Sequence, residues 1–155
     1  MKQTPEMDSV QAEMAPGRIS AAGFLGADQR RLADILSDDD AAVRRLGLTH
    51  QGIADRMREL REAGKSGLGE EVDVPPDHVV RIAGVRGKIP CPFHDGVFDK
   101  VNTIVRNVKS GREIVFTDLS VHMIEAHGFY EGRGSPFRND PAVLAEVLGV
   151  RPAGP

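Results

Sequence analysis

The chain has 155 residues, enough for one ordinary domain or for two small lobes. Its composition, 40% hydrophobic and 28% charged, is typical of a globular protein, and no apolar run approaches the roughly 20 residues of a membrane-spanning helix. The single cysteine excludes an intrachain disulfide and the polar N-terminus lacks the apolar stretch of a signal peptide, so we expect a cytoplasmic protein.

The N-terminal half is predicted to be helical. Residues 1–18 follow no period, which indicates a flexible leader. Residues 19–63 are expected to form a small helical lobe of three helices. Their expected N-caps are Asp28, Ser37 and Thr49. The helix after Thr49 looks like the opening helix of a helix-turn-helix, but no convincing recognition helix follows it.

The C-terminal half is predicted to be a mixed module. Residues 64–77 hold three Gly and two Pro, which favours a linker. Residues 78–150 then change period: short β-branched runs predict strands, and the turn at 109–111 predicts a hairpin. Two helices are expected after it, from about Thr117 to His127 and from Asp140 to Leu148, with residues 151–155 as a tail. The fold class is therefore α+β.

The charge of the chain is unevenly distributed. Residues 1–78 carry 10 Lys+Arg against 15 Asp+Glu, a balance of about −5, whereas residues 79–138 carry 9 against 6, a balance of about +3. This basic excess is weak beside that of dedicated nucleic-acid-binding proteins. An anionic partner is compatible with the second half, and so is ordinary charge scatter.

The residues that carry chemistry lie between positions 91 and 127. Two residues separate Cys91 from His94, 27 residues follow, and four residues separate His122 from His127. Zinc takes about four N or S ligands at tetrahedral corners, and a turn with one close pair and a helix with a second pair supply them. We therefore predict a Zn²⁺ site with the ligands Cys91, His94, His122 and His127. Four protein ligands would close the coordination sphere and favour a structural role.

This pattern resembles zinc modules of the two-Cys-two-His and treble-clef kind over about 40 residues. Cys91 lies where the first knuckle cysteine would be, His94 replaces the second, and His122 and His127 match the helical pair. The resemblance implies a zinc-clipped β-hairpin and helix. Because the spacing departs from that of DNA-reading fingers, it does not extend to reading DNA.

The helical pair raises a geometrical question. At about 100° per residue, His122 and His127 lie roughly 140° apart around an ideal helix, which predicts that the last turn loosens. Gly128 directly follows His127, where a helix can change its final turn.

Other interpretations use the same residues. A metal-free cluster needs only buried, hydrogen-bonded side chains. A small enzyme would use Cys91 as a thiolate nucleophile with a histidine base oriented by Asp95 or Asp118, or an open metal with Asp95 or Glu125 as general base.

The loop from Gly128 to Asp140 is a second candidate site. Its candidate partner-binding residues are Tyr130, Arg133 and Arg138, whose guanidinium groups and aromatic face suit a phosphate or a single-stranded base. The alternative is a surface loop that packs its aromatic rings on the module. We expect a binding or adaptor module for a protein or nucleic-acid partner.

Overall fold

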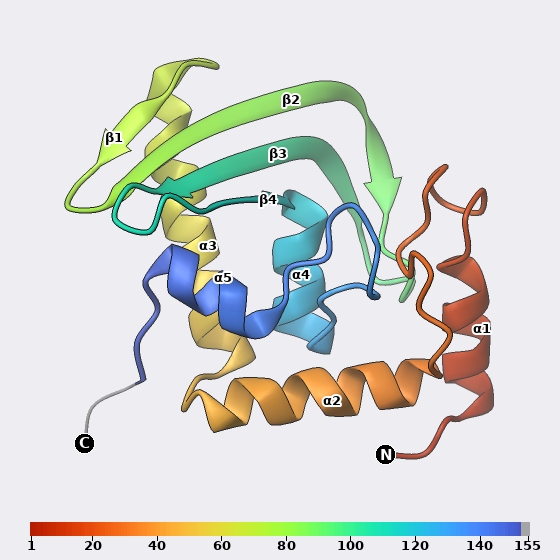
Figure 1. The fold of residues 1–155 in the computed structure, drawn as a ribbon. Coiled ribbons are helices and arrows are strands. Elements are labelled where there is room, and N and C mark those ends of the chain that lie inside the picture. The colour runs from red at the N-terminus through yellow and green to blue at the C-terminus, as the bar shows by residue number, and fades with distance from the viewer. Residues whose placement is uncertain (153–155) are drawn as a thin grey trace.

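In the computed structural model, which describes residues 1–152, helices precede and follow a four-stranded antiparallel sheet with the strand order β1-β2-β3-β4. The helices lie on one side of the sheet, and the long β2–β3 hairpin bends over them (Figure 1). The predicted α+β class with its helical N-terminal part is confirmed. The helices are α1 (Pro5–Glu13), α2 (Leu32–Arg45), α3 (His50–Gly64), α4 (Asp118–His127) and α5 (Pro141–Leu148). The strands are β1 (Val72–Val74), β2 (His78–Pro90), β3 (Val97–Asn107) and β4 (Glu113–Thr117), and a 3-10 turn (Lys65–Gly67) precedes β1.

The N-terminal segment differs from the predicted flexible leader. Thr4 caps α1 by accepting a hydrogen bond from the Met7 amide, and Pro5 is its first residue. This N-terminal segment also caps the next helix: the side chains of Gln3, just before α1, and Gln11, within α1, accept hydrogen bonds from the first amides of α2. These long-range contacts order a segment that has no hydrophobic period of its own.

α2 is one continuous helix where two short helices were predicted. Ser37 and the acids after it do not start a new helix, because the buried stripe of Ile35, Leu36 and Val43 continues through them. Asp39, also on this stripe, is 4% exposed and is neutralised by Arg138. The helix begins at Leu32, because Asp28 is engaged instead by Arg30 and by the Arg133 amide.

The remaining helices begin and end where local signals predicted. Thr49 caps α3, Thr117 caps α4 with Ser120 in a reciprocal capping box, and Asp140 caps α5. Gly128 ends α4 with a φ of 62°, a left-handed conformation that glycine adopts without penalty.

The predicted linker is partly sheet. β1 lies within residues 64–77 and pairs with β2, with Val72 opposite Val80. β2 pairs with β3 down to Pro90 opposite Val97, so residues 91–96 form the tip of this hairpin. The register shifts between Gly84 and Lys88, where the hairpin bends. The predicted tail begins at Arg151, and its residues 153–155 lie outside the described part of the chain.

Two hydrophobic clusters hold the layers together. The larger packs α3, α4 and α5 against the sheet through residues such as Met57, Val105, Phe116 and Leu144. The second joins α1 and α2 to α4 and to the hairpin tip, and it contains Cys91. The tip is thus held where the N-terminal helices α1 and α2 meet α4.

Candidate metal centre

The hairpin tip forms a tight turn around Cys91. The Cys91 amide donates to the carbonyl of Gly96 at 2.9 Å, and the His94 amide donates to the carbonyl of Cys91 at 2.9 Å. Cys91 is 1% exposed and lies among apolar residues of α1, α2 and α4. This turn supplies one half of the candidate site, and α4 supplies the other.

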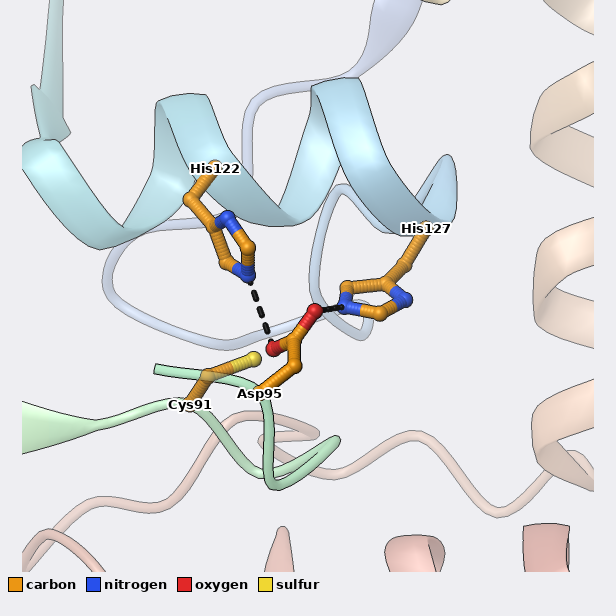
Figure 2. Close-up of side chains that lie close together, drawn as sticks. All are labelled: Cys91, Asp95, His122 and His127. Carbon is orange, nitrogen blue, oxygen red and sulfur yellow. Dashed lines mark hydrogen bonds and ion pairs between the residues drawn. The ribbon is translucent and has the colours of Figure 1, made fainter. Parts of the chain in front are cut away.

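Four side chains converge between the turn and the helix. Figure 2 shows His122 and His127 reaching from α4 toward Asp95 and Cys91 on the hairpin tip. The Nε2 atoms of His122 and His127 lie 2.8 Å from Oδ1 and Oδ2 of Asp95, respectively. One ligand atom from each of Cys91, Asp95, His122 and His127 lies within 4.8 Å of every other. The four residues form a cluster that can hold a metal ion.

The cluster contains three of the four predicted ligands and Asp95 in place of His94. His94 is exposed, and its backbone has a φ of 65°, in the left-handed region. This conformation lets the turn close. The side chain that lies against the two histidines is that of the next residue, Asp95. Asp95 was named from the sequence only as an orienting group or general base. A carboxylate oxygen is nevertheless a regular zinc ligand, and Asp95 is only four residues from Cys91.

Aromatic rings hold both imidazoles in place. Phe93, from the turn, stacks on His127 with ring centroids 3.9 Å apart and an interplanar angle of 8°. Phe98, at the start of β3, lies against His122 with centroids 4.6 Å apart. Sequence reasoning did not identify these rings, although Phe93 lies within the predicted knuckle and Phe98 follows it by four residues. They restrict the imidazole orientations before any ion binds, which lowers the cost of ordering ligands.

The helical spacing of the histidines is bridged without unwinding. α4 continues through His127, yet the centroids of the two imidazole rings are 5.4 Å apart. The side chains converge from either side of the helix face, with the Asp95 carboxylate between them (Figure 2). The expected loosening of the last turn is therefore not needed.

The electrostatics of the cluster favour a cation. Burial alone would raise the pKa of Asp95, but hydrogen bonds from Cys91 and His122 and the two nearby imidazoles lower it to about 2. Burial lowers the pKa of His127, against the attraction of Asp95. Near neutral pH the cluster thus has an ionised carboxylate and a His127 that resists protonation, the forms in which both bind metal.

The thiol is not that of an activated nucleophile. Burial, and next the hydrogen bond to Asp95, raise the pKa of Cys91 to about 12. Reactive cysteines have a lowered pKa and are partly exposed. Cys91 has a raised pKa and is buried. A metal ion would reverse this state, because a coordinated thiol is deprotonated outright.

Polar residues of the loop after α4 make hydrogen bonds and ion pairs with other parts of the same chain. Tyr130 is 2% exposed, and its hydroxyl lies 2.8 Å from Nδ1 of His50. Arg138 makes a two-pronged ion pair with Asp39 and also donates to the Glu131 carbonyl at 2.9 Å. Among the three candidate partner-binding residues, only Arg133 is exposed. Tyr130 and Arg138 therefore stabilise the packing of this loop on α2 and α3.

Among residues 1–152, no helix combines the length and the apolar character that crossing a bilayer requires.

In comparisons with known proteins, no family model, curated protein or solved structure matches the chain. Its candidate function therefore depends on the cluster itself.

Proposed function

We propose that this chain is a zinc-binding protein in which Cys91, Asp95, His122 and His127 coordinate one Zn²⁺ that fastens the β2–β3 hairpin tip to α4. The observation that carries the proposal is the convergence of the four ligand atoms within 4.8 Å. Tetrahedral bonds of about 2.0–2.3 Å put ligand atoms about 3.3–3.8 Å apart. The longest separation in the cluster therefore needs to shorten by only about 1 Å, and the 2.8 Å contacts between Asp95 and the two histidines need to lengthen by about 0.5 Å when the ion replaces the shared protons.

The donor set fits zinc in charge as well as in size. A thiolate, a carboxylate and two neutral imidazoles together carry two negative charges, which neutralise Zn²⁺. Hard cations such as Mg²⁺ prefer oxygen ligands alone, whereas one sulfur and two nitrogens select a softer ion. Four protein ligands leave no position for a substrate, which supports a structural role.

The location of the cluster gives the ion a mechanical task. Cys91 is part of the hydrophobic cluster that joins α1, α2 and α4, while Asp95 is at the open end of the turn with its side chain 39% exposed. Coordination would tie this exposed end to the helix. Metal binding would thus stabilise the native fold, since the separated ligands of the unfolded chain hold the ion less well.

The test is the zinc content of the untagged protein, measured by elemental analysis. We expect about one zinc per chain, and its loss in Cys91→Ala and His127→Ala. His94→Asn is the matched control, because His94 is in the same turn but outside the cluster and Asn tolerates its positive φ. The control should retain zinc. Less than about 0.2 zinc per chain, together with a melting temperature that chelation does not change, would overturn the proposal.

The expectation of an adaptor role for a protein or nucleic-acid partner stays a prediction. Because Tyr130 and Arg138 are committed to contacts within the chain, we assign no partner to their loop. Retention on heparin or a short RNA at low salt would support an anionic partner, and its absence would exclude one.

A further inference from the structure

A second feature lies apart from the metal centre, on the side where the hairpin bends. A partly open cavity of about 270 Å³ lies between β2, β3, the start of α4, the loop before α2 and the loop after α4. Most of its lining is apolar, including Phe24, Val85, Ile89 and Phe137. None of the four metal-centre residues lines it. The volume suits a molecule of one ring and a short chain, below the size of most ligand sites.

One buried acid lines this apolar cavity. Glu131 is 4% exposed, and its Oε1 accepts a hydrogen bond of 2.7 Å from the Ser135 hydroxyl. Within residues 1–152 this is the single hydrogen bond to its carboxyl group, because the guanidinium of Arg138 binds Asp39 and the Glu131 backbone carbonyl instead. Burial raises the pKa of Glu131 to about 7, against the effects of Ser135 and Arg138. The carboxyl group of this lining residue thus keeps unused hydrogen-bonding capacity.

The backbone conformation around Glu131 fixes the position of this residue in the cavity lining. Glu131 has a φ of 68°, a left-handed conformation that is unfavourable for a residue with a Cβ. The adjoining Gly132 amide donates to the carbonyl of Phe24 at 2.8 Å, and a Cβ on Gly132 would lie 2.3 Å from the Leu25 carbonyl oxygen. The two loops thus touch backbone to backbone. Strain of this kind, kept in place by tight packing, is common at ligand sites.

We propose that this cavity binds a small apolar amine, with the ammonium group received by the carboxylate of Glu131 and the hydrocarbon part by the apolar lining. Charge complementarity selects this class: in the described part of the chain, residues 1–152, no cationic side chain is bonded to the buried acid, and an ammonium group supplies both the charge and the donors. The other charged residue of the lining, Lys100, is exposed, so water solvates its ammonium group. An anionic ligand would have to meet Glu131 without compensation.

The experiment compares three molecules of one shape on the full chain. Amide chemical shifts are followed by NMR during titration with 2-phenylethylamine, 2-phenylethanol and 3-phenylpropionate. We expect the amine to shift amides that line the cavity with a Kd of about 1 mM, as its size allows. The alcohol should bind at least about tenfold more weakly, because it lacks the charge that strengthens the hydrogen bond of the ammonium group to Glu131. The carboxylate should not bind, because its charge has the same sign as that of Glu131.

Two isosteric or near-isosteric variants complete the test. Glu131→Gln should reduce amine binding by about tenfold and leave alcohol binding unchanged. Lys100→Met, on the same lining, should bind the amine at least as tightly as the unmodified protein. The proposal is overturned if the amine shifts no cavity amide, if Glu131→Gln binds it equally well, or if 3-phenylpropionate binds best. The ligand series on the unmodified protein decides the matter even if Glu131→Gln fails to fold.

Discussion

Histidines meet acids in two regions of the molecule, one around His50 and the other around His122 and His127. The hydrogen-bond partners of the imidazole rings differ between the two regions. Each ring nitrogen of His50 has its own partner: Nδ1 lies 2.8 Å from the Tyr130 hydroxyl, and Nε2 lies 3.1 Å from Oδ1 of Asp40. In contrast, His122 and His127 direct Nε2 at the same carboxylate, with the Cys91 thiol beside it. The first arrangement is complete in itself. The second brings four ligand atoms around one point, where an ion would fit.

The comparison shows what separates a structural histidine from a candidate ligand. Residue type does not, since both regions combine imidazole with aspartate. Burial does not either, since the side chains of His50, His122 and His127 are 24%, 19% and 19% exposed. The difference is convergence: separate partners satisfy His50, whereas a shared acid and a thiol surround one position at the hairpin tip.

Removing zinc should have the largest effect. Chelation of the zinc-loaded protein is expected to lower its melting temperature by about 10 °C, because an ion present at about 1,000 times its Kd contributes about 4 kcal/mol to the native state. Calorimetry with and without a chelator measures this change. A matched scan of the zinc-free Cys91→Ala variant should show no response to the chelator, and a response there would locate the ion elsewhere.

Exchanging one histidine in each region should separate their roles. His127→Gln should abolish the zinc-dependent part of the stability. His50→Gln should retain zinc and cost about 1–2 kcal/mol with or without it, because the buried Tyr130 hydroxyl loses its partner. Urea unfolding of both variants with and without zinc provides the free energies. Equal loss of zinc from both variants would contradict the contrast between the regions.

The smallest expected effect is a pH dependence of the zinc-free protein. Because the folded-state pKa of His127 is lowered, the unfolded chain takes up the proton more readily, and this contribution to stability is present above about pH 6.5. It is lost as the pH falls through the folded pKa. The stability of the unmodified protein relative to His127→Gln should therefore decrease from about pH 7 to about pH 5 in urea titrations. A relative increase would refute the assigned direction.

Much of the fold follows from signals that are local in the sequence. Thr49, Thr117 and Asp140 cap helices through contacts within three residues, so their positions could be read from the chain. α1 also carries a local signal in Thr4 and Pro5, but its order depends on Gln3 and Gln11 meeting α2, more than 20 residues away in the sequence. Contacts of this kind have no local pattern.

The candidate site was likewise predictable only where its signal is local in the sequence. The spacing drew attention to Cys91, His122 and His127, because a turn and a helix each present a close pair. Whether His94 or Asp95 joins them depends on one backbone torsion in the turn, the φ of 65° at His94, which spacing does not reveal. The burial of Tyr130 likewise depends on His50, which lies 80 residues away.

X-ray absorption at the zinc edge of the loaded protein tests the central claim most directly. Coordination by Cys91, Asp95, His122 and His127 predicts one sulfur at about 2.3 Å and three nitrogen or oxygen atoms at about 2.0–2.1 Å. In Cys91→Ala the sulfur contribution should disappear. A spectrum of the unmodified protein without sulfur would contradict the assignment of this metal centre.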